Sequence, residues 1–125
     1  WNSAQATRRS IYRVVWRGIP DPFMEALDFP DLGLLTPKRT SSVSSLQSLA
    51  LFNNNFVLHS SQWLSDRAKK EHPNLDSQIH RLIELLWVRP PTSKEQTLFK
   101  TYAKKHGLSA LCRILINSNE FLFIE

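Results

Sequence analysis

The 125-residue chain has one cysteine, three glycines and no long apolar run. The single Cys112 excludes a disulfide within the chain and a zinc site built on cysteines. Three scattered glycines exclude a glycine-rich phosphate-binding loop. No stretch approaches the roughly 18 apolar residues that a membrane-spanning helix requires, so we expect no membrane span.

The sequence also lacks the motifs of catalytic and metal centres. None of its four histidines is paired with another in a His-x-x-x-His arrangement. His80 has Glu84 four residues later, a spacing that is typical of a pair on a helix surface. The serines between 41 and 48 occur without a Gly-x-Ser-x-Gly nucleophile motif. We therefore expect no metal site, no cofactor and no catalytic residue within this chain.

The positive charge of the chain is spread along its length. The net charge is +5, yet no block of five or six like charges occurs. Arg9, Arg13 and Arg17 would share one face of a helix and could contact phosphates. Nucleic-acid binding through this basic N-terminal face is kept as an alternative, but it is disfavoured because such surfaces usually carry a denser charge.

Enough apolar residues are present for a folded core. Hydrophobic residues make up 42% of the chain, with four tryptophans and seven phenylalanines, which argues against intrinsic disorder. Cys112 has Leu111 and Ile114 as apolar neighbours, so we expect it to be a small buried side chain. The chain begins at Trp1 without an initiator methionine, and we expect it to be the C-terminal fragment of a larger domain.

Residues 42–125 show apolar side chains at helical spacing, separated by helix-breaking residues. The breaks are the asparagines at 53–55, Pro73, the prolines at 90–91, and Gly107. Asp76 is expected to cap the helix after Pro73, and Ser109 to open the last one. Thr92 and Glu95 have the spacing of a capping box.

The first third of the chain is expected to be irregular. Gly18, Pro20 and Pro22 interrupt any regular element there, and Asp21 is expected to cap a short helical turn that starts at Pro22. We predict an all-α protein: an orthogonal bundle of about four to five helices over 42–125, with an irregular or extension segment at 1–41. The whole chain, 1–125, is expected to be a single domain.

The end of the chain combines an apolar tail with a polar interruption. Residues 121–124 are continuously apolar, and we expect this tail to be buried in the core. The polar residues at 117–120 are expected to face inward, against the helix that carries Gln47 and Asn53. Together with two arginines beside loops, they form a candidate polar network, which either locks helix ends together or binds a ligand. The candidate residues are Arg39, Gln47, Asn53, Arg89, Asn117, Asn119 and Glu120.

Several motifs, in order, resemble those of one known family. They are Arg-Arg-Ser-Ile-Tyr at 8–12, Phe-Pro-Asp at 29–31, Arg-Thr at 39–40, Leu-Gln-Ser-Leu-Ala-Leu-Phe-Asn at 46–53, Arg-Pro-Pro-Thr at 89–92, and the polar-apolar end at 111–122. They resemble the C-terminal half of a domain of unknown function, family 1553, which is abundant in planctomycetes. The chain departs from that family at Leu35 and Thr36, where a cysteine is frequent, and at Gly107, where a tryptophan often precedes the last helix.

The resemblance indicates the localisation and domain organisation of the parent protein, but no chemical activity. Members of this family are large, exported, modular proteins that often carry a cytochrome-c-like domain, so a haem-bearing domain is expected elsewhere in the parent protein. We therefore expect an extracytoplasmic protein, periplasmic or secreted, whose partners are the upstream domains of the same chain. The main hypothesis is a helical structural or interaction module without activity of its own. The alternative is part of a hydrolase, or of a carbohydrate-active or redox-associated enzyme, whose site upstream domains complete.

Overall fold

The computed structural model describes residues 12, 18–19, 21–30 and 44–123, which form seven α-helices. The predicted all-α helical bundle is confirmed. The chain comprises two compact units, Trp1–Ala50 and Leu51–Glu125, and the boundary between them lies within α2 (Ser45–Asn53). Most of the predicted irregular segment at 1–41 lies outside the described residues.

In the first unit, the sequence sets the start of both helices. Asp21 caps α1 (Pro22–Ala26), where its carboxylate accepts hydrogen bonds from the amides of Phe23 at 3.0 Å and Met24 at 3.1 Å. Ser44 and Gln47 form a reciprocal capping box at the start of α2, in which each side chain accepts from the backbone amide of the other at 3.1 Å.

The second unit begins with the last turn of α2 and the helix that follows. The asparagine run ends α2 at Asn53, and the Asn54 side chain accepts a hydrogen bond from the Phe56 amide at 2.8 Å, which caps α3 (Asn55–Glu71). Asparagine tolerates such breaks because its side chain competes with the helix for backbone hydrogen bonds. The break predicted from residues 53–55 is confirmed.

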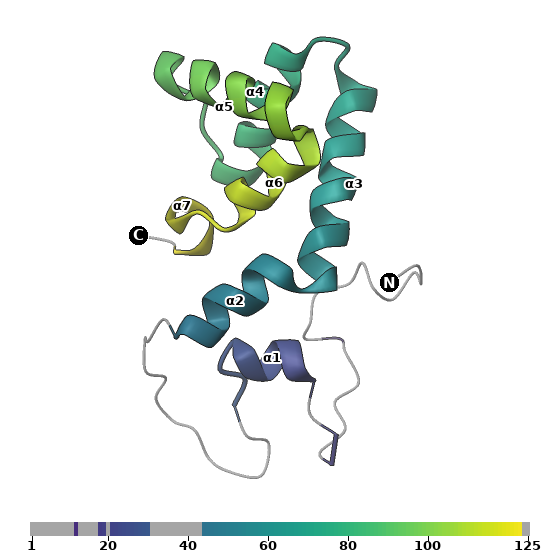
Figure 1. Ribbon diagram of the computed structural model, residues 1–125, viewed down its shortest axis with the longest axis vertical. Coiled ribbons are helices and arrows are strands. Elements are labelled where there is room, and N and C mark those ends of the chain that lie inside the picture. Colours follow the sequence, from purple (N-terminus) through teal and green to yellow (C-terminus); the bar gives the residue numbers. More distant parts are fainter. Residues whose placement is uncertain (1–11, 13–17, 20, 31–43, 124–125) are drawn as a thin grey trace. The chain divides into compact units, whose positions relative to one another are not determined.

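The core of this unit lies between α3, α4 (Leu75–Trp87), α5 (Ser93–His106) and α6 (Leu108–Ile116). Figure 1 shows α6 running alongside α3, and α6 also packs against α4 and α5. Five of its nine side chains are buried: Leu108, Leu111, Cys112, Leu115 and Ile116. The buried face of α3 is built largely from small side chains, including Ser61, Ser65 and Ala68. Small residues there allow α6 to lie close to α3.

Two predicted helix starts are wrong by one or two residues. Asn74, not Asp76, is the cap residue of α4, because the Asp76 carboxylate is bound by Lys100 and Gln96 of α5 instead. α6 begins at Leu108, not Ser109, because the single residue Gly107, with a φ of 90°, both ends α5 and precedes α6. The capping box of Thr92 and Glu95 at the start of α5 is confirmed.

The expectation that the apolar tail is buried is wrong for its described part. Phe121 is 40% exposed and Phe123 is 51% exposed. The core is already filled by α6, and the short α7 (Asn119–Leu122) packs on α4 and α6. Ile124 lies outside the described residues. None of the described helices has the length and apolar character of a membrane span.

The two buried serines of α3 provide a stability test. Ser61 donates to the Val57 carbonyl at 2.8 Å, whereas the Ser65 hydroxyl is buried without a hydrogen-bond partner. A buried hydroxyl without a partner lowers stability because it has lost its water. We expect Ser65→Ala to leave the free energy of unfolding unchanged or raise it by up to about 1 kcal/mol, and Ser61→Ala to lower it by about 1 kcal/mol.

Chemical denaturation of both variants at neutral pH measures these changes. A Ser65→Ala variant that is destabilised as much as Ser61→Ala would show that the Ser65 hydroxyl is satisfied in solution.

Candidate functional site

Arg89 is the centre of a polar cluster at the end of α4. It lies just after α4, beyond Val88, whose left-handed backbone ends the helix. Its guanidinium binds the Glu95 carboxylate through two parallel hydrogen bonds of 2.7 and 2.9 Å. It also binds both carboxylate oxygens of Glu120, one of them from Nη2 at 3.0 Å. Paired hydrogen bonds of this kind fix geometry as well as charge.

Trp87 connects this cluster to the end of α6. Its indole N–H donates to the Ser118 hydroxyl at 2.8 Å, and that hydroxyl donates to the Leu115 carbonyl at 2.6 Å. The Arg89 guanidinium lies 4.9 Å from the centre of the Trp87 ring, in cation–π contact. We call Trp87, Arg89, Glu95, Ser118 and Glu120 the Arg89 cluster. It joins the end of α4, the start of α5 and the start of α7.

Arg89 and the carboxylates it binds shift one another's pKa values. Hydrogen bonding from Arg89, and then from the Thr92 backbone amide, lowers the pKa of Glu95 to about 2. The two carboxylates raise the pKa of Arg89, with Glu95 the larger influence. Glu95 is therefore ionised at neutral pH and has no proton to donate. An ionised carboxylate whose oxygens are already bound is a poor general base as well.

A second set of contacts holds the end of α2. Arg113 donates to the Phe52 carbonyl at 2.7 Å and to the Asn53 side chain at 3.1 Å, and its guanidinium lies 4.2 Å from the centre of the Phe52 ring. Asn117 donates to the Leu51 carbonyl at 3.3 Å. These bonds satisfy carbonyls that a helix end leaves without partners. Sequence reasoning missed Arg113, whose signal was that it is the one charged residue in α6.

The candidate residues from the sequence thus fall into separate places. Arg89 and Glu120 meet in the Arg89 cluster, while Asn53, at the end of α2, and Asn117, at the end of α6, both belong to the contacts that hold the end of α2. Gln47 caps its own helix.

Asn119 is exposed, as is Glu120, so the expectation that residues 117–120 all face inward is wrong for these two. The reason is that α7 turns away from the core after Ser118. Arg39 lies outside the described residues, as do Arg9, Arg13 and Arg17.

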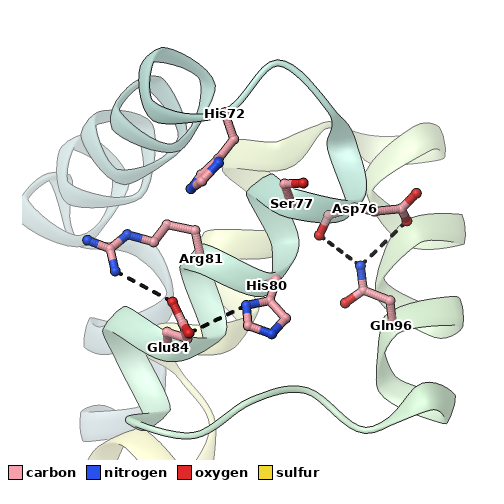
Figure 2. Close-up of a pocket in the computed structure, with 7 residues that line it drawn as sticks. All are labelled: His72, Asp76, Ser77, His80, Arg81, Glu84 and Gln96. Carbon is pink, nitrogen blue, oxygen red and sulfur yellow. Dashed lines mark hydrogen bonds and ion pairs between the residues drawn. The ribbon is translucent and has the colours of Figure 1, made fainter.

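A pocket of about 410 Å³ lies on the exposed face of α4 (Figure 2). Residues of α4 form its floor, and Gln96 of α5 and His72, which follows α3, stand at its edges. Within it, the Glu84 carboxylate lies 3.6 Å from His80 Nδ1 and 3.5 Å from Arg81 Nη1. The lining residues are His72, Asp76, Ser77, His80, Arg81, Glu84 and Gln96.

Neither region provides a metal site within the described part of the chain, where no three His, Cys, Asp or Glu side chains could jointly hold an ion. Cys112 has no exposed surface, and its burial raises the pKa of the thiol to about 12. A thiol in this setting stays protonated and is not a nucleophile at neutral pH.

The lowered pKa of Glu95 makes stability depend on pH. The unfolded carboxyl, with an ordinary pKa of about 4.3, takes up a proton before the folded one does, whose pKa is about 2. The stabilisation is therefore complete above about pH 5 and is lost as the pH falls towards 2. We expect Glu95→Gln to be less stable than the parent at neutral pH, and the difference to shrink as the pH falls over that range.

Chemical denaturation at a series of pH values measures this difference. Asp66→Asn is the matched control, because the Asp66 carboxylate has no arginine bound to it: it accepts a hydrogen bond from the neutral Gln62 side chain at 3.0 Å and lies 4.0 Å from Lys69. Stability curves of Glu95→Gln and the parent that stay parallel down to pH 2 would contradict the assignment. The stability of the parent and of Glu95→Gln will each still fall at low pH, since Arg67 and Arg81 also lower the pKa of Glu71 to about 2.

Comparison with protein families gives one match. The family model described as PSD1, Protein of unknown function (DUF1553), matches residues 1–103. The matched range includes Arg89 and Glu95 and ends within α5, so α6 and α7 lie outside it. No curated protein and no solved structure matches the chain significantly. The match covers most of the chain and confirms the resemblance seen in its motifs: this chain belongs to the DUF1553 family of proteins of unknown function.

Proposed function

We propose that this chain is a helical structural and interaction module of a larger, exported, multidomain protein, and that it has no catalytic activity of its own. In this proposal it packs against upstream domains of the same protein. The motifs that resemble the family support the exported, multidomain setting, because that is the setting the resemblance implies.

The observation that carries the proposal is that Arg89 binds both carboxylates of the Arg89 cluster. Arg89 satisfies two carboxylates at once, and Glu95 is also bound by Thr92. A catalytic carboxylate needs an open oxygen and a pKa near the working pH. Glu95 has neither, whereas a cluster that joins three helix ends has an evident role in holding the fold together.

Exposed apolar side chains support the interaction part of the proposal. Trp63 on α3 and Leu98 on α5 are each 65% exposed, and Phe121 and Phe123 add further apolar surface at α7. Exposed tryptophans are enriched where proteins meet, because they bury a large area when a partner covers them. We infer that at least Trp63 is covered in the complete protein.

Hydroxyl-radical footprinting tests this coverage. The oxidation rate of Trp63 is measured in the 125-residue chain and in the complete protein. We expect Trp63 to be several-fold less reactive in the complete protein, because a neighbouring domain shields it. Trp87, which is half-buried and hydrogen-bonded within the Arg89 cluster, is the internal control and should react at the same rate in both.

Equal reactivity of Trp63 in the two proteins would overturn the proposal that this face packs on another domain. Reduced reactivity of both tryptophans would also count against it, since the change would then reflect a general tightening of the unit.

A further inference from the structure

The short helix α7 depends on contacts with other elements to stay in place. It is a single turn of four exposed residues, with no side-chain cap at its start. One turn does not persist alone in water, because nucleation fixes more backbone angles than its few hydrogen bonds offset. Figure 1 shows α7 at the edge of the second unit, past the end of α6. Ser118, just before it, is bound by Trp87 at 2.8 Å, so the chain is fixed up to that residue.

The ion pair between Glu120 and Arg89 fastens α7 to the end of α4. The two side chains are 41% and 33% exposed. An exposed ion pair stabilises by a small amount only, because water solvates both charges when the pair opens. Phe121, the next residue, is also exposed, so little apolar burial supplements the pair. The pair therefore favours the docked position of α7 by only about two- to fivefold.

Arg89 itself is held by groups that do not belong to α7. Its Nη1 and Nη2 edge binds Glu95 through two hydrogen bonds of 2.9 and 2.7 Å, and Nη1 also donates to the Pro90 carbonyl at 3.1 Å. The Trp87 ring lies against the guanidinium at 4.9 Å. If α7 leaves, Arg89 therefore keeps its orientation, and its Nε and Nη2 edge opens to solvent.

This second edge of Arg89 is shaped for a carboxylate. Nε and Nη2 each donate to one oxygen of Glu120, the paired geometry that a guanidinium and a carboxylate share. Phosphate can also accept two such bonds, but the carboxylate of Glu95 on the first edge repels a doubly charged anion more strongly than a singly charged one. The present occupant is a glutamate followed directly by Phe121, which indicates the kind of segment that fits.

We propose that α7 is a displaceable strap, and that an acidic segment of a partner domain replaces Glu120 on Arg89 when the strap moves away. The segment presents a glutamate followed by an aromatic residue, as α7 does. This inference rests on the proposed interaction role of the module and names the chemistry of its partner. It makes Glu120 an internal competitor that keeps the site closed until the partner binds.

Nuclear magnetic resonance of the ¹⁵N-labelled 125-residue chain tests the proposal. The probe is the end-blocked peptide Ser-Asn-Glu-Phe-Leu-Phe, which copies residues 118–123. We expect saturable shifts at the Arg89 Nε–H and the Trp87 indole N–H. Glu120→Gln should bind the peptide about three- to sixfold more tightly than the parent, because its own carboxylate no longer competes.

Hydrogen exchange in the parent reports displacement of the strap. The amides of Leu122 and Phe123 donate to the Ser118 and Asn119 carbonyls in the docked α7. Saturating peptide should accelerate exchange at both amides, because the strap loses its place on Arg89.

Two controls separate the Arg89 site from general charge effects. Glu84→Gln removes a carboxylate that lies 3.5 Å from Arg81, outside the Arg89 cluster, and should bind as the parent does. A peptide with glutamine in place of glutamate should bind about fivefold more weakly, because it loses the charge of the hydrogen-bonded group. Arg89→Met should abolish the shift of the Trp87 indole, and the glutamine peptide keeps the test decisive if that variant does not fold.

Four outcomes overturn the proposal: equal affinity of Glu120→Gln and Glu84→Gln, equal affinity of the two peptides, inorganic phosphate bound as tightly as the peptide, or unchanged exchange at Leu122 and Phe123 with peptide bound. The footprint of Trp63 does not depend on the strap. A covered Trp63 without peptide binding therefore refutes this inference alone, and an uncovered Trp63 with peptide binding refutes only the packing of that face.

Discussion

The second unit depends on the burial of α6. This nine-residue helix buries five side chains and packs against α3, α4 and α5 at once, so all three helices lose apolar contacts if α6 is displaced. Small residues on α3, including Ser61 and Ala68, make room for it, and Gly107 allows the chain to enter it directly from α5. Burial of this kind supplies most of the free energy that holds small helical domains together.

The Arg89 cluster complements that apolar core at the opposite end of α6 from Gly107. The core fixes how the helices lie, while Arg89, Trp87 and Ser118 fix how their ends are joined. The bonds that let the cluster join helix ends make it a poor catalytic centre, since Glu95 is ionised at neutral pH and Arg89 binds both carboxylates.

Local features were predicted well from the sequence, and long-range partners were not. The capping box of Thr92 and Glu95, the cap at Asp21 and the stop at Gly107 each depend on residues within four positions, so spacing alone reveals them. Arg89 and Glu120 were candidates, but their pairing spans 31 positions and depends on the packing of α7. Arg113 was missed because its acceptors include a backbone carbonyl of α2, and carbonyls leave no pattern in a sequence. The exposed tail was mispredicted because apolar content does not reveal that α6 has already filled the core.

The central claim is that the Arg89 cluster is structural and holds α7 in place. A double-mutant cycle on the free energy of unfolding, with Arg89→Met, Glu120→Gln and the combined variant, tests it most directly, together with hydrogen exchange at the Leu122 and Phe123 amides of α7 and its end. The account predicts a coupling of about 0.5 to 1 kcal/mol and faster exchange at both amides in each single variant. Additive effects, with exchange at α7 unchanged, would contradict it.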